Sequence, residues 1–246
     1  MKNIFKINPV TYFILGSMML CGYFNYFLII SFILFIHDLG HIFVMKAYKI
    51  EIYKIDILPF GSVIETNVNY NIPSYKLFWI SLAGVLFQVL LYPCFYFLYK
   101  WGFINDISYN IFIFYNNLII IFNLLPLIPL DGSKILLSLV ETIFPYKISL
   151  KLLNSISILG TLLFVIFNKI TLNVLLICLF IFLRTYTEIL NHKLIFNKFL
   201  LERCLYNLNF KKVKYINNIN KMYKNRFNII NNQREDKYLR ERFKYV

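Results

Sequence analysis

The chain has 246 residues, of which 59% are hydrophobic and 15% are charged, and its formal net charge is +14. Soluble domains average about 45–50% apolar and about 25% charged residues, so the composition excludes an ordinary soluble protein and predicts an integral membrane protein. The four cysteines, Cys21, Cys94, Cys178 and Cys204, are scattered without the close pairs typical of metal sites, and we interpret them as apolar filler. The first apolar run leads into further apolar segments without a small-residue cleavage site, so we expect no cleavable signal peptide.

Six apolar segments approach or reach the length of about 20 residues that a membrane-spanning helix needs. They are 9–24, 26–47, 77–99, 109–130, 152–168 and 170–188. With six spans, all of the 26 Lys and Arg residues except Lys100 and Lys169 lie on one side of the membrane, as the positive-inside rule requires of the cytoplasmic side. We therefore predict an all-α polytopic protein with a membrane domain over 1–188 and both termini in the cytoplasm.

Residues 189–246 form a basic tail with fourteen Lys and Arg residues against four acids. Such segments attract anionic lipid with about 1 kcal/mol per basic residue near the surface. Apolar residues interleave with the basic ones, which predicts helices on the membrane surface; they are Phe196, Phe199, Leu200, Leu205, Phe210 and Tyr215. The tail could anchor the topology or dock an acidic face of a substrate, and we expect no nucleic acid there. His192 lies far from the metal motif and is not counted as a ligand.

The stretch 32-FILFIHDLGHIFVM-45 contains two of the three histidines and an aspartate. Ionisable side chains in hydrocarbon are costly and therefore rare without a function. His37 and His41 are four residues apart, so on a helix their imidazoles lie on one face and can reach one metal ion. Asp38 lies beside them, where a carboxylate can act on water as it does in H-E-x-x-H sites. The alternative is a packing role, in which the histidines hydrogen-bond to neighbouring helices.

A catalytic zinc usually takes three protein ligands, and 122-FNLLPLIPLDGSKIL-136 provides the acid that fits as the third. Asp131 follows more than twenty residues without a charge. Pro126 and Pro129 break the helix before it, and Gly132 permits a close backbone approach. Asn123 could hydrogen-bond substrate backbone or bridge helices. The alternative for Asp131 is a surface acid in a cytoplasmic turn.

Residues 50–72 contain β-favouring residues around Pro59, Phe60 and Gly61, which predicts a short β-element after the second span. Peptide bonds are hard to hydrolyse inside a helix, so a substrate must unwind first. An edge strand close to the metal could hold it extended by strand addition. The alternative is an ordinary structured loop.

H-x-x-x-H in an early span, followed by N-x-L-P-x-x-P-L-D-G in a later one, resembles the site-2 protease family of intramembrane zinc metalloproteases. The stretch 58-LPFGSVIE-65 resembles a membrane-reentrant β-element of some members. The arrangement without a PDZ insertion, and the basic segment 188-EILNHKLIFNKFLLER-203, are most similar to the stage IV sporulation subgroup of Firmicutes. The resemblance extends to about residue 205.

This resemblance implies that His37, His41 and Asp131 hold one Zn²⁺ per chain and that Asp38 stands in the place of the general-base glutamate. It implies that the chain cleaves a membrane-embedded or membrane-associated regulatory protein. For the sporulation subgroup that substrate is a sigma-factor precursor, and a pair of inhibitory membrane proteins is expected as partners. The protein would then lie in the bacterial cell membrane or in the membrane that surrounds the forespore.

The sequence departs from the family pattern in three places. Asp38 is one methylene shorter than glutamate, about 1.5 Å at full extension, and a misplacement of about 1 Å can cost on the order of 100-fold in rate. Ser133 stands where the family has a second glycine. About 45 residues follow Arg203, too few for the nucleotide-binding module of some relatives.

Two other classes of protein remain as alternatives. A pseudoprotease would keep the zinc and act as a membrane binding protein, and Asp38 is the feature that favours it. A transporter would use the intramembrane His and Asp as an ion path, but it would show inverted repeats or more paired charges, which the sequence lacks.

Overall fold

The computed structural model describes residues 5–7, 9, 11, 16–17, 20–58, 61–66, 70–167, 171–206, 208, 210 and 212–243. The chain falls into two compact units. Unit 1 comprises Met1–Asn69 and Trp79–Leu124, and unit 2 comprises Tyr70–Phe78 and Leu125–Val246. Most described residues are helical, in agreement with the predicted helical membrane protein.

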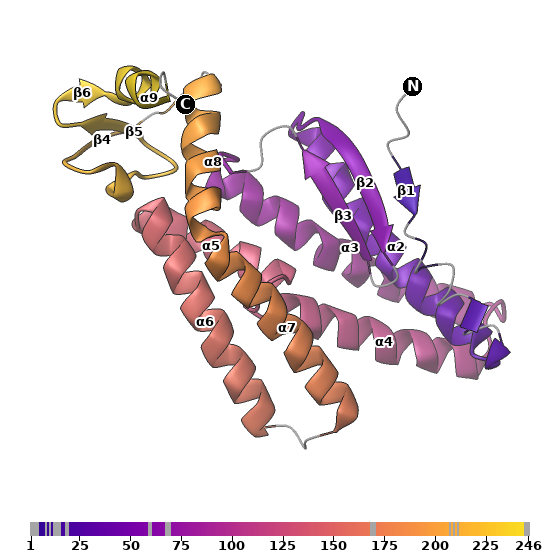
Figure 1. Cartoon of the computed structure of the whole chain (residues 1–246). Helices are drawn as coiled ribbons and strands as arrows, with labels where there is room; N and C mark the ends of the chain where they lie inside the picture. Colours follow the sequence, from indigo (N-terminus) through magenta and orange to yellow (C-terminus); the bar gives the residue numbers. More distant parts are fainter. Residues whose placement is uncertain are drawn as a thin grey trace. The chain divides into compact units, whose positions relative to one another are not determined.

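Unit 1 is built from three long helices, α2 (Phe24–Ala47), α3 (Ser74–Lys100, from Trp79 onward) and α4 (Asp106–Leu124) (Figure 1). A small apolar core joins them, in which the rings of Phe95 and Phe112 stack with centroids 3.7 Å apart. Large apolar side chains also point outward all along these helices. Such exposure is expected where a helix faces lipid rather than water.

A short sheet follows α2, as the sequence predicts. Strand β2 (Ile52–Leu58) pairs antiparallel with β3 (Gly61–Thr66), and Ile55 on β2 is buried. A third strand that the sequence analysis did not predict, β1 (Phe5–Ile7), pairs parallel with β2. The sheet order β1-β2-β3 places β3 at an edge among the described strands.

Unit 2 contains α5 (Asp131–Ile143), α6 (Tyr146–Phe167), α7 (Leu172–Leu190) and α8 (His192–Leu205). Helices α6 and α7 lie side by side, and α8 continues α7 after a bend of 58° (Figure 1). Small polar residues join the pair, since the hydroxyls of Ser157 and Thr185 are 2.9 Å apart. Such small hydroxyl side chains are typical of helix contacts in membranes.

The end of the chain folds into a C-terminal module, which comprises strands β4 (Val213–Ile216), β5 (Phe227–Ile230) and β6 (Gln233–Arg234), the 3₁₀ helix Ile219–Lys221 and helix α9 (Glu235–Phe243). Asn231 and Asn232 make the tight turn between β5 and β6 with positive φ values of 49° and 64°, which asparagine tolerates. The module packs against α8 around one apolar core; its buried residues include Phe196, Phe199, Leu200, Met222, Ile230 and Leu239.

This module corrects the expectation for the tail. The predicted membrane-surface helix would expose Phe196, Phe199 and Leu200, but all three are buried. The sheet was not predicted from the sequence because β4, β5 and β6 are only four, four and two residues long. Alternation over so few residues is hard to separate from the apolar residues of a surface helix.

Four described helices are long and apolar enough to cross a membrane, namely α2, α3, α4 and α6, and α7 with α8 would make a fifth as one bent span. The predicted spans 26–47, 77–99, 152–168 and 170–188 correspond to helices. The predicted span 109–130 is too long, because α4 ends at Leu124, before Pro126. Most of 9–24 lies outside the described residues, so the count of six spans stays a prediction.

Candidate metal centre

The histidine pair lies on α2 in unit 1. His37 and His41 are 5% and 8% exposed, so both imidazoles are shielded from solvent. Their rings meet edge to face with centroids 4.6 Å apart, and the two Nε2 atoms are 3.0 Å from each other. The helical spacing predicted from the sequence therefore brings the two ring nitrogens together.

Helix α3 provides acceptors for the other nitrogen of each ring. The His41 Nδ1 lies 2.6 Å from the carbonyl oxygen of Ile80, and the His37 Nδ1 lies 3.0 Å from the Oε1 of Gln88. A carbonyl oxygen can only accept, so the His41 Nδ1 carries a proton, and in the neutral ring the Nε2 is then the nitrogen with the lone pair. Metal-binding histidines are held in this way, with the distal N–H donated to a carbonyl or carboxylate.

Two glycines make this close contact between α2 and α3 possible. A Cβ atom on Gly84 of α3 would lie 2.5 Å from the His37 Cε1 and 2.6 Å from the His41 Nε2. A Cβ atom on Gly40 of α2 would lie 2.6 Å from the carbonyl oxygen of Ala83. Neither helix could approach the other this closely with a larger residue at these positions.

Asp131 lies in unit 2 as the first residue of α5, and it is 5% exposed. The turns containing Pro126 and Pro129 separate α5 from α4 and leave the carboxylate at a helix N-terminus, where the helix dipole stabilises a negative charge. The Nζ of Lys134, one turn later, is 3.1 Å from the Asp131 Oδ1. The predicted acid is thus a buried carboxylate at the start of a helix and not a surface residue of a turn.

The remaining predicted site residues have simpler surroundings. Asp38 is half-buried on α2, next to His37, and Asn123 is half-buried in the last turn of α4. Gly61 begins β3, whereas Pro59 and Phe60 lie outside the described residues. Gln88 was not predicted as a site residue, although it is the sole amide or charged side chain in the apolar run 77–99, a signal that could have identified it.

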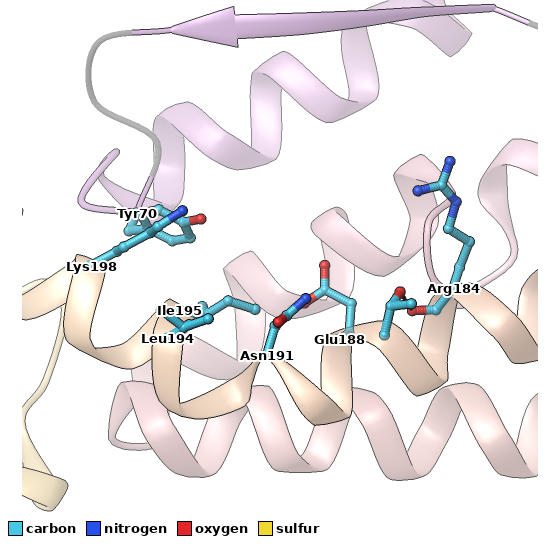
Figure 2. Close-up of a pocket in the computed structure, with 8 residues that line it drawn as sticks. Tyr70, Arg184, Glu188, Asn191, Leu194, Ile195 and Lys198 are labelled. Carbon is cyan, nitrogen blue, oxygen red and sulfur yellow. Dashed lines mark hydrogen bonds between the residues drawn. The ribbon is translucent and has the colours of Figure 1, made fainter.

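A separate pocket of about 330 Å³ opens at the bend between α7 and α8 in unit 2 (Figure 2). Arg184 and Glu188 of α7 and Lys198 of α8 line it, together with Tyr70 from the segment before α3. Burial, Glu188 and Glu202 all raise the pKa of the Tyr70 hydroxyl, so the phenol stays protonated at neutral pH. The pocket mixes both signs of charge and therefore defines no particular ligand.

The chain is similar in sequence to two curated proteins. It is 31% identical to stage IV sporulation protein FB of Bacillus subtilis over 57% of this chain and 49% of that protein. It is 29% identical to zinc metalloprotease MJ0392 of Methanocaldococcus jannaschii over 60% of this chain and 43% of that protein. The chain thus spans about half the length of these relatives or less. No family model matches it.

The fold is that of a solved site-2 protease from Methanocaldococcus jannaschii, with a TM-score of 0.59 and 23% sequence identity over 76% of this chain and 92% of the other. The resemblance predicted from the two motifs is confirmed by these relatives. Together with the apolar helices, it makes the chain an integral membrane protein related to metalloproteases.

Proposed function

We propose that this relative of the site-2 proteases is an intramembrane zinc metalloprotease, in which His37, His41 and Asp131 hold one Zn²⁺. The observation that most supports it is the histidine pair. Two imidazoles whose Nδ1 atoms face acceptor oxygens turn their Nε2 lone pairs toward each other at 3.0 Å. Two facing lone pairs repel each other unless a proton or a metal cation lies between them, and two imidazole nitrogens arranged in this way are a typical part of a zinc site.

The donor set fits zinc. The three residues offer two imidazole nitrogens and a carboxylate oxygen, all buried. Three protein ligands of these types leave a fourth position for water or substrate in catalytic zinc sites. When bound, zinc supplies a positive charge that makes water acidic near neutral pH and polarises a carbonyl group.

The chain's own residues then move the proton. Asp38 follows His37 on α2, where its carboxylate can accept a proton from the attacking water and return it to the leaving amine. The hydroxyl of the water joins the acyl carbon while the peptide C–N bond breaks. Asp38 thus acts as base and then as acid, and its charge is restored at the end of the cycle.

The substrate would bind as an extended strand. We propose that β3 and the residues Pro59, Phe60 and Gly61 bind an unwound segment of the substrate by strand addition, and that Asn123 hydrogen-bonds the backbone of that segment. The substrate class is a membrane-associated regulatory protein, and the sporulation relative favours a sigma-factor precursor. Inhibitory membrane proteins and anionic lipid at the basic tail would be the partners, in a bacterial membrane with both termini of this chain in the cytoplasm.

The zinc assignment is tested by metal analysis of the purified chain. We expect about one zinc per wild-type chain and none in Asp131→Ala, with cleavage lost as well, because two imidazoles alone hold zinc weakly. Asp106→Ala is the matched control, since Asp106 also begins a helix but is exposed. Normal zinc content in Asp131→Ala would refute the assignment of this ligand.

The role of Asp38 separates a protease from a pseudoprotease. Wild type, Asp38→Asn and Asp38→Glu are each co-expressed with a tagged sporulation sigma-factor precursor from the same genome. Cleavage by wild type that is lost in Asp38→Asn is expected for a working base. Cleavage by Asp38→Glu alone would favour the pseudoprotease, because the scaffold would then lack only the longer side chain that reaches the water.

A further inference from the structure

We propose that Gln88 and Asn116 are positioning residues that fix the orientation and tautomer of His37. The three side chains come from the three helices of unit 1, α2, α3 and α4, and they form one hydrogen-bonded chain. Gln88 and Asn116 are both 0% exposed and His37 is 5% exposed, so water does not compete for these bonds. The inference rests on the proposed zinc site, to which it adds the residues that hold one ligand in place.

The direction of the hydrogen bonds follows from a backbone carbonyl. The Asn116 Nδ2 lies 3.3 Å from the backbone oxygen of Gln88, which can only accept, so the Asn116 amide nitrogen points there. The Asn116 Oδ1 is consequently directed to the Gln88 Nε2, 3.4 Å away. Both bonds are long, but together they allow one orientation of the Gln88 amide.

With its nitrogen committed to Asn116, Gln88 presents its Oε1 to the Nδ1 of His37 at 3.0 Å. An amide oxygen only accepts, so the His37 Nδ1 must carry a proton, which in the neutral ring leaves the lone pair on Nε2. The carbonyl of Ile80 imposes the same tautomer on His41. The side chain of Gln88 therefore accepts the Nδ1–H of His37, just as the backbone carbonyl of Ile80 accepts the Nδ1–H of His41.

The use of an amide is consistent with the surroundings. Helix α3 is a candidate membrane span, in which an ionised side chain at position 88 would be expensive. A neutral amide orients His37 without a charge, but it has two ends and would be free to flip. Asn116 removes that freedom, which gives a specific reason for a second buried amide on α4.

Zinc affinity of the full chain in detergent, measured by competition with a chelator, tests this role. Gln88→Leu keeps the approximate volume and removes the acceptor, and we expect zinc to bind about 10–100-fold more weakly, as when other partners of ligand histidines are lost. Gln88→Glu loses the donor to Asn116 and carries the cost of a charge, but it restores an acceptor oxygen of the kind that often faces a metal-binding histidine, so it should bind zinc clearly more tightly than Gln88→Leu. Ser81→Ala is the control, because Ser81 is equally buried on α3 and lies outside the hydrogen-bonded chain.

The outcomes separate this inference from the proposed function. If Gln88→Leu binds zinc as tightly as wild type, or if Gln88→Glu binds as weakly as Gln88→Leu, the positioning role is overturned while the zinc site stands. A wild-type chain that binds no zinc would overturn both. Thermal unfolding of the metal-free variants shows whether each variant still folds. If Gln88 only packed the helices together, Gln88→Leu would lower the melting temperature, and Gln88→Glu would not restore zinc affinity.

Discussion

The two units bury polar side chains in different ways. In unit 1 the hydrogen-bonded chain from His37 to Asn116 contains no side chain with a permanent charge. In unit 2 the Nζ of Lys224, in the C-terminal module, lies 2.9 and 3.1 Å from the two carboxylate oxygens of Glu141 on α5. Lys224 and Glu141 are 4% and 1% exposed, so this is a fully buried ion pair.

A second buried ion pair organises the C-terminal module itself. The guanidinium of Arg203 on α8 donates to Glu235 at 3.2 Å and to the backbone carbonyl of Tyr223 at 2.8 Å. The other carboxylate oxygen of Glu235 accepts from the backbone and side chain of Asn228. Both charges therefore have several partners, which a buried ion pair needs to offset its desolvation.

The difference follows the surroundings of each network. The His37 network joins three candidate membrane spans, whereas α5 and the C-terminal module are not among the spans found in the described residues. Charged side chains are costly in hydrocarbon, so neutral amides make buried polar contacts between membrane spans at a lower cost in free energy. The C-terminal module uses ion pairs instead, and its buried charges fix which elements pack together. Here they join α8, α5 and the module.

The largest effect is expected from breaking the Glu141–Lys224 pair. Lys224→Met leaves a buried carboxylate without its cation, which should reduce the free energy of unfolding by about 3–5 kcal/mol. The free energy of unfolding is measured by chemical denaturation in detergent, monitored with a spectroscopic probe in the C-terminal module.

Two further variants sharpen this result. Lys221→Met in the same module is the control, because Lys221 is exposed, and it should change stability by less than about 0.5 kcal/mol. Combining Lys224→Met with Glu141→Leu removes both charges and should recover most of the loss. If Lys224→Met alone were as stable as wild type, the Glu141–Lys224 pair would not stabilise the fold. The proposed difference between the two units would then be wrong.

The sequence predicted most of unit 1 and less of unit 2 for a physical reason. The predicted spans 26–47 and 77–99 agree with α2 and α3 to within three residues at each end, because long apolar runs bounded by Lys or Pro leave little choice. The C-terminal module was missed because its strands are short and its core depends on contacts with α8, which a local pattern does not encode.

In the candidate site, too, the sequence predicted what local helix geometry determines and not what depends on contacts between helices. The spacing of His37 and His41 predicted their contact, since helix geometry alone determines it. The sequence also pointed to Asp131, through its isolation after an apolar run. The isolation of Gln88 in an apolar run could have singled it out, but its contact with His37, like the contact of Gly84 with both histidines, depends on how α3 meets α2 in space.

Gly84→Ala tests the close contact of unit 1 and should have the next largest effect. The new Cβ would lie within 2.7 Å of three ring atoms of His37 and His41. Overpacking of this kind costs about 1–3 kcal/mol, and displaced imidazoles should bind zinc more weakly by a similar free energy. Gly16→Ala is the control, because a Cβ atom at that position would have no described atom within 4 Å. Unchanged zinc affinity in Gly84→Ala would mean that the two helices separate easily and that their contact does not position the ligands.

The smallest effect is expected at Ser157 of α6 in unit 2. This residue makes an uncharged hydrogen bond, as the buried side chains of the His37 network do in unit 1. The Ser157 hydroxyl accepts from the backbone N–H of Ile128 at 3.0 Å, three residues before Asp131. Ser157→Ala leaves that buried N–H without its acceptor and should cost about 1 kcal/mol, within the range measured for hydrogen bonds between membrane helices. Ser155→Ala, exposed on the same helix, should be neutral. A loss near that of Lys224→Met would contradict the contrast between neutral and charged contacts, because a single hydroxyl would then stabilise unit 2 as much as its buried ion pair.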